Sequence, residues 1–150
     1  MADDELRQAG FEQVHVENSR YDGPQTGVAD VGGVPHYFER QNRFFEDGDE
    51  FVVWLIDEVT LALEREQWRV FVATWDAGHA GSDDPDADPN AGVLPDRYHE
   101  LTKVLEPRRV APDDTRTMYA QWRLTGSDRR HDDNGPSYLM RWREPDSDAT

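Results

Sequence analysis

The clearest pattern along the chain is a pair of short, largely apolar runs, 27–31 and 34–39, separated by two adjacent glycines. A Gly-Gly pair between such runs predicts a β-hairpin with a primed turn, because glycine enters positive-φ positions without strain. The resulting register places His36 opposite Ala29, on the face whose other members are apolar. We therefore expect this face of the hairpin, His36 included, to belong to the core.

Near residue 57 the hydrophobic pattern changes from a continuous apolar run to the spacing of a helix. Residues 51–56 are apolar at consecutive positions, which predicts a central strand covered on at least one side by helices. Asp57 then has the side chain of a helix N-cap, and apolar residues follow at helical spacing as far as about Trp75. Because 67–75 is also rich in β-forming residues, a strand there is the alternative to the last part of the helix.

The second half of the chain contains one more helical pattern and two alternating ones. An Asp-, Pro- and Gly-rich loop over 80–93 is expected to be mobile. A helix is predicted to begin near Pro95 and to stop before Pro107, since apolar residues recur there at spacings of three and four. Residues 118–124 and 138–143 alternate apolar and polar positions, which predicts two closing strands.

These elements predict an α+β fold: an antiparallel sheet of about five strands with two helices packed on one face. The length of 150 residues and the 36% hydrophobic content suit one modest core. We expect 1–20 to be a weakly ordered N-terminal segment, 21–145 a single α+β domain and 146–150 a disordered tail. Within the first segment, Phe11, Val14 and Val16 are candidates for a short strand or an anchor.

One segment of the chain is similar to a known group of proteins. The stretch Tyr21-Asp-Gly-Pro-x-x-Gly-Val-Ala29, followed by Gly33-Val-Pro-His-Tyr-Phe-Glu39, resembles a family of uncharacterised small bacterial and archaeal proteins. The resemblance extends over roughly residues 20–107 through Trp68, Trp75, His79 and the helix entry Leu94-Pro-Asp-Arg. The family has no established activity, so the resemblance implies no catalytic roles. It favours a helix over 58–79.

Charge changes the interpretation of the polar sites. Thirty-two acidic residues against sixteen basic ones give a net charge of −16, with Arg strongly preferred over Lys and Asp over Glu. This bias resembles that of haloarchaeal cytoplasmic proteins, because a Debye length of about 3 Å at molar salt removes most self-repulsion. We interpret the acidity as adaptation to salt rather than as a binding signal, and we do not expect nucleic acid as a partner.

Several functional classes are excluded by what the sequence lacks. Without cysteine there can be no disulfide, no thiolate nucleophile and no cysteine-ligated zinc or iron–sulfur centre. No apolar run reaches the roughly 18–20 residues of a membrane span, and the acidic start differs from a signal peptide. No phosphate-binding loop or nucleophilic-serine motif is present. We therefore expect a soluble, cytoplasmic protein with no membrane partner.

Two histidines and two carboxylates are the candidates for catalysis. His36 could act as a general base or metal ligand, and His79 could converge with it near Asp76 or Glu39. Simpler roles are favoured, namely a hydrogen-bonded core histidine at the first site and a helix-capping histidine at the second. The spacing typical of zinc enzymes is absent, and 84–95 departs from a calcium loop at its glycine and glutamate positions. No metal and no cofactor are expected.

The candidate ligand-binding residues are aromatic and arginine side chains: Tyr21, Tyr37, Arg123, Arg141 and Arg143. Arg141 and Arg143 are two residues apart on one predicted strand and therefore project from the same face. Arg123 belongs to the outward set of the neighbouring strand, together with Tyr119 and Gln121. Such a face offers forked N–H groups to a carboxylate or phosphate. The alternative, favoured by the abundance of acids, is that these arginines pair with Asp and Glu of the chain itself.

The preferred hypothesis is a non-enzymatic binding or interaction module whose partner is a protein or a small anionic ligand. The alternative is a metal-assisted or His/carboxylate hydrolase. A cavity that holds both histidines and a carboxylate would favour the hydrolase. A flat, exposed surface of aromatic and arginine side chains would favour the module.

Overall fold

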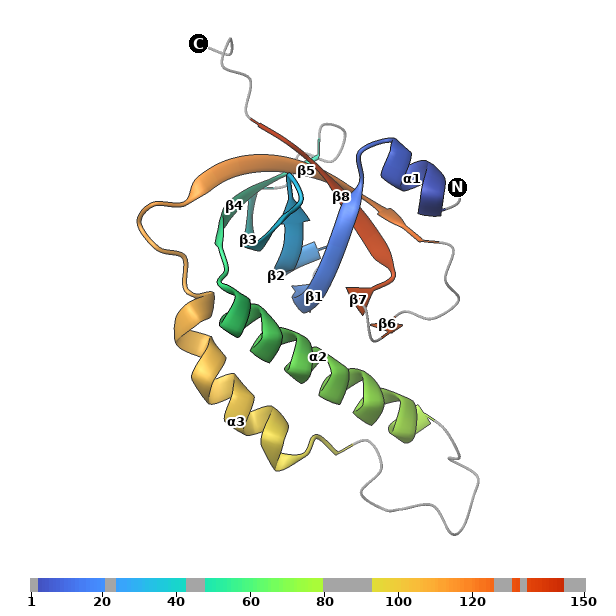
Figure 1. Cartoon of the computed structure of the whole chain (residues 1–150), viewed down its shortest axis with the longest axis vertical. Coiled ribbons are helices and arrows are strands. Elements are labelled where there is room, and N and C mark those ends of the chain that lie inside the picture. Colours follow the sequence, from blue (N-terminus) through green and yellow to red (C-terminus); the bar gives the residue numbers. More distant parts are fainter. Residues whose placement is uncertain are drawn as a thin grey trace.

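The computed structural model shows an antiparallel β-barrel with helices on its outside (Figure 1). It describes residues 3–20, 24–42, 48–79, 93–125, 131–132 and 135–144. The strands in chain order are β1 (Glu12–Arg20), β2 (Pro24–Val31), β3 (Val34–Asn42), β4 (Asp49–Leu55), β5 (Arg116–Leu124), β6 (His131–Asp132), β7 (Gly135–Pro136) and β8 (Tyr138–Arg143). The helices are α1 (Asp3–Gln8), α2 (Glu58–His79), α3 (Asp96–Leu105) and the short 3-10 helix η2 (Glu106–Arg109).

The barrel closes in the strand order β1-β2-β3-β4-β5-β8. At the closing seam, Glu12 of β1 pairs with Met140 of β8, and Gln13 pairs with Leu139. The α+β class and the antiparallel pairing are confirmed, but the expectation of an open sheet with two helices packed on one face is wrong. The sheet closes because the segment 1–20, expected to be weakly ordered, supplies helix α1 and the additional strand β1.

Strand β1 changes face partway along, although Val14 and Val16 alternate in the sequence as if they belonged to one face. Val14 pairs with Ala29 but Val16 pairs with Val28, so a bulge between them shifts the register by one residue. Val14 therefore packs inside the barrel and Val16 outside it, beneath helix α2. Gly27 lies beside the bulge, where a Cβ atom would overlap the Val16 carbonyl oxygen. Only glycine allows the two strands to approach so closely.

The interior of the barrel is filled by side chains from all of its strands. The buried members are Val14, Ala29, Val31, Phe38, Phe51, Val53, Met118, Ala120, Tyr138 and Met140, with Trp122 and Trp142 packed against them. Phe51 and Trp142 meet edge to face with ring centres 5.3 Å apart. The inward positions predicted for β5 and β8 are confirmed by this set, with the exception of Leu124, which is 60% exposed.

The Gly-Gly hairpin forms with the predicted register. Ala29 faces His36 across the pair β2–β3, and the turn residues Gly32 and Gly33 have φ angles of 63° and 80°. The Glu12 carboxylate accepts hydrogen bonds from the amides of both glycines, at 3.0 and 2.6 Å. Glu12 therefore ties the turn of the hairpin to strand β1.

Helix α2 lies across the outer side of the barrel, with α3 alongside it (Figure 1). The buried residues of this outer layer are Val16, Val28, Tyr37, Trp68 and Val72. Helix α3 buries Leu101 and Leu105, whereas α1 adds Leu6 to a separate small cluster with Phe11 and Leu139. None of the described helices combines the length and the apolar character that crossing a membrane requires.

The predicted start of α2 is confirmed. The Asp57 carboxylate accepts a hydrogen bond from the Thr60 amide at 2.7 Å, and this bond lowers the pKa of Asp57. The helix continues to His79, so the alternative strand over 67–75 is wrong. Helix α3 likewise ends before Pro107, as predicted.

Candidate functional site

The outer faces of β5 and β8 carry the arginine residues that the sequence pattern singled out. We call this surface the arginine face; it consists of Tyr119, Gln121, Arg123, Arg141 and Arg143. Tyr119 pairs with Arg143 and Gln121 pairs with Arg141 across the two strands. These four residues, with Trp142, line a hollow of about 310 Å³. The side chains predicted to point outward from the two strands therefore share one surface.

Arg141 is held in place by uncharged neighbours. Its guanidinium carbon lies 4.9 Å from the centre of the Phe11 ring. Its two terminal nitrogens donate hydrogen bonds to the Ala9 carbonyl oxygen and to the Gln121 side-chain oxygen. These contacts fix the direction of the group, and no carboxylate among the described residues neutralises its charge.

The two other arginines of this face also lie against aromatic rings. The Arg143 guanidinium is 4.9 Å from the centre of the Tyr119 ring, and that of Arg123 is 6.0 Å from the Phe11 ring. Within the residues that the structure describes, Arg123 forms no ion pair with Asp or Glu. The alternative in which acids of the chain neutralise these arginines therefore has no support at Arg123 or Arg141.

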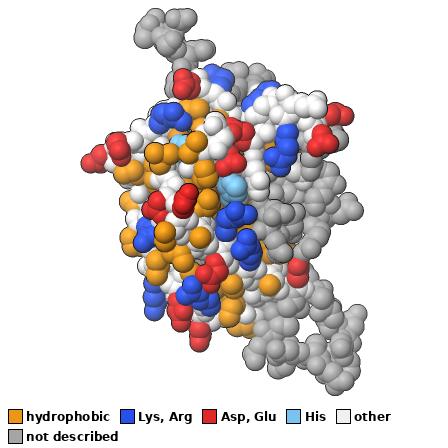
Figure 2. Space-filling view, viewed as in Figure 1, with side chains coloured by type: hydrophobic (Ala, Val, Ile, Leu, Met, Phe, Trp, Pro, Cys, Tyr) orange, Lys and Arg blue, Asp and Glu red, His pale blue; other side chains and the backbone are white. Residues whose placement is uncertain are grey.

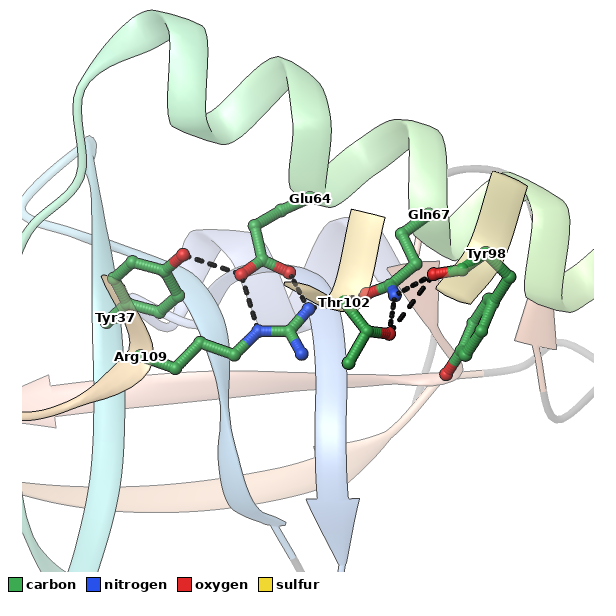
Figure 3. A network of polar contacts seen from close by, with 6 residues as sticks. All are labelled: Tyr37, Glu64, Gln67, Tyr98, Thr102 and Arg109. Atoms are coloured by element: carbon green, nitrogen blue, oxygen red, sulfur yellow. Dashed lines mark hydrogen bonds and ion pairs between the residues drawn. The ribbon is translucent and has the colours of Figure 1, made fainter. Parts of the chain in front are cut away.

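A buried polar network joins the barrel to the helices (Figure 3). Glu64 of α2 is fully buried, and one of its oxygens accepts the Tyr37 hydroxyl at 2.6 Å. Arg109 of η2 donates to both carboxylate oxygens of Glu64, at 2.8 and 2.7 Å. The paired guanidinium offsets the cost of burying the Glu64 charge.

The contacts of the network shift the proton affinities of two of its members. Burial, and then the neighbouring Glu64 carboxylate, raise the pKa of Tyr37 well above its ordinary range. Burial by itself would lower the pKa of Arg109, but the hydrogen bonds and the negative charge of Glu64 raise it overall. Tyr37 therefore keeps its proton and Arg109 keeps its charge.

Gln67 extends the network from α2 to α3. Its side-chain oxygen accepts a hydrogen bond from Arg109, and its nitrogen donates to the Tyr98 carbonyl at 3.0 Å and to the Thr102 hydroxyl at 2.6 Å. Thr102 in turn donates to the Tyr98 carbonyl at 3.1 Å. Strand β3 and the elements α2, α3 and η2 thus share one continuous set of polar contacts (Figure 3).

The network places Tyr37 differently from the sequence-based expectation. Tyr37 was expected at a ligand-binding rim, but its side chain is 3% exposed because α2 covers the outer face of β3. Its role in the structure is to hold Glu64. Tyr21, the other aromatic candidate, lies outside the described residues.

Apart from Tyr37, the residues of the network were missed at the sequence level, although Glu64 carries a signal. Glu64 lies three residues after Leu61 and four before Trp68, so it belongs to the apolar stripe of α2. A charged residue at such a position has to be buried with a partner. No spacing in the sequence links it to Arg109.

A groove of about 320 Å³ between β1 and α2 adjoins the network. Its aromatic lining comes from the two long helices: Trp68, Phe71, Trp75 and Tyr98. Gln67 and Arg109 also reach the groove, but both are already engaged with Glu64 or with α3. The helices therefore contribute mainly aromatic surface to this groove.

The structure does not bring the candidate catalytic residues together. His36 faces the inside of the barrel, whereas Glu39, three positions along the same strand, faces outward. His36 pairs with Leu55, just before α2 begins, while Asp76 and His79 lie at the other end of this 22-residue helix. The described residues contain no group of three or more His, Asp or Glu placed to hold a metal ion. The side chain of His79 lies outside the described residues.

Charges of both signs are mixed on the surface. Figure 2 shows acidic, basic and hydrophobic side chains interspersed on the face that is also seen in Figure 1. The acidic loop over 80–92 and the tail 146–150 lie outside the described residues.

No protein-family model, no curated protein and no solved structure matches the chain. The resemblance to the small bacterial and archaeal family stays a prediction. Function has to be inferred from the geometry and chemistry of the sites themselves.

Proposed function

We propose that the protein is a non-enzymatic binding module whose arginine face holds carboxylate or phosphate groups of an anionic ligand. The observation that carries the proposal is the surroundings of Arg141. Its guanidinium is oriented by the Phe11 ring and by two oxygen acceptors, and no acid among the described residues neutralises it. An oriented guanidinium with uncommitted N–H groups binds two oxygens of an anion at once.

The spacing along β8 suits a ligand with more than one acidic group. Arg141 and Arg143 are two residues apart on the strand, a rise of about 7 Å. Each guanidinium lies against an aromatic ring, so binding costs less side-chain entropy than it would for a freely moving arginine. The hollow of about 310 Å³ between them has room for a small polyanion.

The hydrolase alternative has no comparable support. His36 and Glu39 project from opposite faces of β3, and Asp76 lies at the far end of α2. A general base and its partner need to be within hydrogen-bond reach of each other. The separation of these residues therefore favours the binding module over the hydrolase.

The test is calorimetric titration with citrate and with inorganic pyrophosphate at fixed salt concentration. The double substitution Arg141→Gln and Arg143→Gln should weaken the binding of both ligands about tenfold or more. The free energy of unfolding should change by less than about 1 kcal/mol, since these side chains are exposed. Acetate should bind more weakly than citrate, because it can occupy only one guanidinium.

Arg69→Gln is the matched control, because Arg69 is exposed on α2 and outside the arginine face. It should leave both affinities unchanged. The proposal fails if the unaltered protein binds neither polyanion, or if the double variant binds as well as the unaltered protein. Marked destabilisation of the double variant, with no binding to lose, would show that the arginines serve the fold.

A further inference from the structure

We infer that the open end of the barrel binds a small zwitterion with an apolar side chain, that is, an apolar α-amino acid. We call this site the barrel mouth; the lining residues that matter are Val34, His36, Trp54, Leu55, Asp114 and Arg116. Its cavity has a volume of about 540 Å³. This value falls within the size range of ligand pockets. The barrel mouth shares no residue with the arginine face.

The barrel mouth is the outermost layer of the barrel interior. His36 of β3, Leu55 of β4 and Arg116 of β5 each lie two residues from a buried core residue of the same strand, on the inward side. The last pair between β4 and β5 is Val53 with Arg116, so β4 continues past β5 by Trp54 and Leu55. The wall is therefore open at this point. Deeper in the barrel the inward side chains are apolar, whereas in this outer layer His36 contributes an imidazole and Arg116 a guanidinium.

The His36 imidazole, which lines the cavity, is anchored through one ring nitrogen. Its Nδ1 atom lies 2.7 Å from the Val34 carbonyl oxygen. A carbonyl oxygen can only accept, so Nδ1 carries a proton. In the neutral tautomer with this proton, Nε2 has the lone pair. Within the described part of the chain, no side chain donates to Nε2. An N–H group of a ligand can bind there.

Two opposite charges stand at the edge of the cavity. Asp114 and Arg116 are both exposed, and neither has a hydrogen bond or ion pair with another described side chain. Arg109, in contrast, donates three hydrogen bonds to Glu64 and Gln67. The barrel mouth therefore offers a guanidinium for a carboxylate and a carboxylate for an ammonium group.

The apolar part of the lining is exposed as well. Val34 is 47% exposed and Leu55 is 70% exposed, although both are aliphatic. Trp54 also borders the cavity, but its ring stacks on Tyr37 on the outer side of the sheet. Aliphatic side chains left in water next to a cavity gain free energy when a ligand covers them. The ligand therefore needs an apolar portion in addition to its charges.

An apolar amino acid meets all of these requirements at once. Its carboxylate binds Arg116, its ammonium group binds Asp114 and the Nε2 atom of His36, and its side chain covers Leu55. A simple anion would be repelled by Asp114, and a simple cation would be repelled by Arg116. Only a ligand with both charges uses both side chains.

The test is calorimetric titration with leucine, valine, methionine and phenylalanine, together with two analogues of leucine. The analogue 4-methylpentanoate lacks the ammonium group, and leucinamide lacks the carboxylate. At least one of the four amino acids should bind. For leucine, we expect affinity about tenfold or more higher than for either analogue.

Substitutions at the cavity edge assign the contacts. Arg116→Gln should weaken binding of leucine and 4-methylpentanoate about tenfold but not that of leucinamide, which no longer meets a repelling charge. Asp114→Asn should weaken binding of leucine and leucinamide but not that of 4-methylpentanoate, for the same reason. Both side chains are exposed, so the variants should fold. Asp113→Asn and Arg69→Gln are matched controls outside the cavity and should leave every affinity unchanged.

Three results would overturn the inference. The first is the absence of binding by all four amino acids up to about 10 mM. The second is unchanged leucine affinity in both Arg116→Gln and Asp114→Asn. The third is binding of 4-methylpentanoate as tight as that of leucine, because Asp114 would then contribute nothing. None of these results depends on the arginine face, so the two proposals can fail separately.

Discussion

The hydroxyl group of Tyr37 connects the barrel to the charges behind it. It donates its proton to the Glu64 carboxylate at 2.6 Å, so loss of the proton would leave two negative charges side by side. Burial and Glu64 together raise the pKa of Tyr37 above its ordinary value of 10.0. The folded protein therefore retains a proton that the unfolded chain releases near that pH.

This retained proton predicts a loss of stability at alkaline pH. A group whose pKa is higher in the folded state contributes its full stability below the unfolded pKa, and the contribution falls as the pH rises through the interval between the two values. We expect Tyr37→Phe to lose less stability than the unaltered protein between about pH 9 and about pH 12. Urea unfolding at a series of pH values measures this.

Tyr119→Phe is the control for this experiment, because it removes a hydroxyl outside the network. Its hydroxyl donates to the Glu50 carboxylate at the longer distance of 3.3 Å, so its removal should reduce the alkaline loss less than Tyr37→Phe does. An equal alkaline loss in Tyr37→Phe and in the unaltered protein would show that the hydroxyl of Tyr37 does not hold its proton more tightly in the fold.

The burial and hydrogen bonding of a single residue could be predicted from the sequence where its neighbours in the fold are also close to it along the chain. His36 was expected as a buried, hydrogen-bonded histidine because the hairpin register follows from two glycines, and the structure confirms its burial and its bond to Val34. Asp114 and Arg116 could not be placed beside it. Their position depends on how β5 meets β4, which involves residues about sixty positions earlier in the chain.

Among the elements, those with a local pattern were predicted correctly. The cap of α2 and the end of α3 each depend on a few neighbouring residues. Strand β1 was foreseen only as a short strand or an anchor and was not counted in the sheet. Its bulge, which sends Val14 inward and Val16 outward, cannot be inferred from the simple alternation of the two valines. Closure of the barrel could not be predicted, because it requires β1 to pair with β8.

Two acidic residues of α2 each hold an arginine but differ in burial. The Glu64 side chain is 0% exposed and binds Arg109, whereas Glu66 and its partner Arg97 are about half exposed. We expect Glu64→Gln to lower the free energy of unfolding by about 3 kcal/mol, because it leaves the Arg109 charge without compensation. Glu66→Gln should change it little. Chemical denaturation of both variants measures the difference.

Equal effects of the two substitutions would contradict the role given to the network. In that case the docking of α2 and η2 on the barrel would depend on the apolar layer alone. A larger effect at Glu64 would show that the polar contacts help to fix these elements in place.

For the whole molecule, the net charge of −16 opposes compaction. We propose that the composition reflects adaptation to high salt and expect the fold to need roughly molar KCl or NaCl for full stability. The melting temperature should fall as salt is removed, which differential scanning calorimetry measures. A melting temperature that stays constant or rises on removal of salt would contradict the adaptation to salt.

High salt also affects how the two proposed sites would work. At a Debye length of about 3 Å, long-range attraction between ligand and protein is almost abolished. Binding at the arginine face or at the barrel mouth then depends on direct contacts of guanidinium, carboxylate and imidazole groups. Under these conditions, the orientation of Arg141 by Phe11 contributes more to ligand affinity than the charge of the surrounding surface does.

The seam between β1 and β8 joins residues 12–13 to residues 139–140, so it forms only when distant parts of the chain have met. Closing such a long loop costs more conformational entropy than forming the local hairpins from β1 to β4. The four-stranded meander can therefore assemble first, while its interior is still open to water, and β8 completes the wall last. In the folded protein, we therefore expect amide hydrogens to exchange through local opening first at this short seam, which hydrogen–deuterium exchange measures.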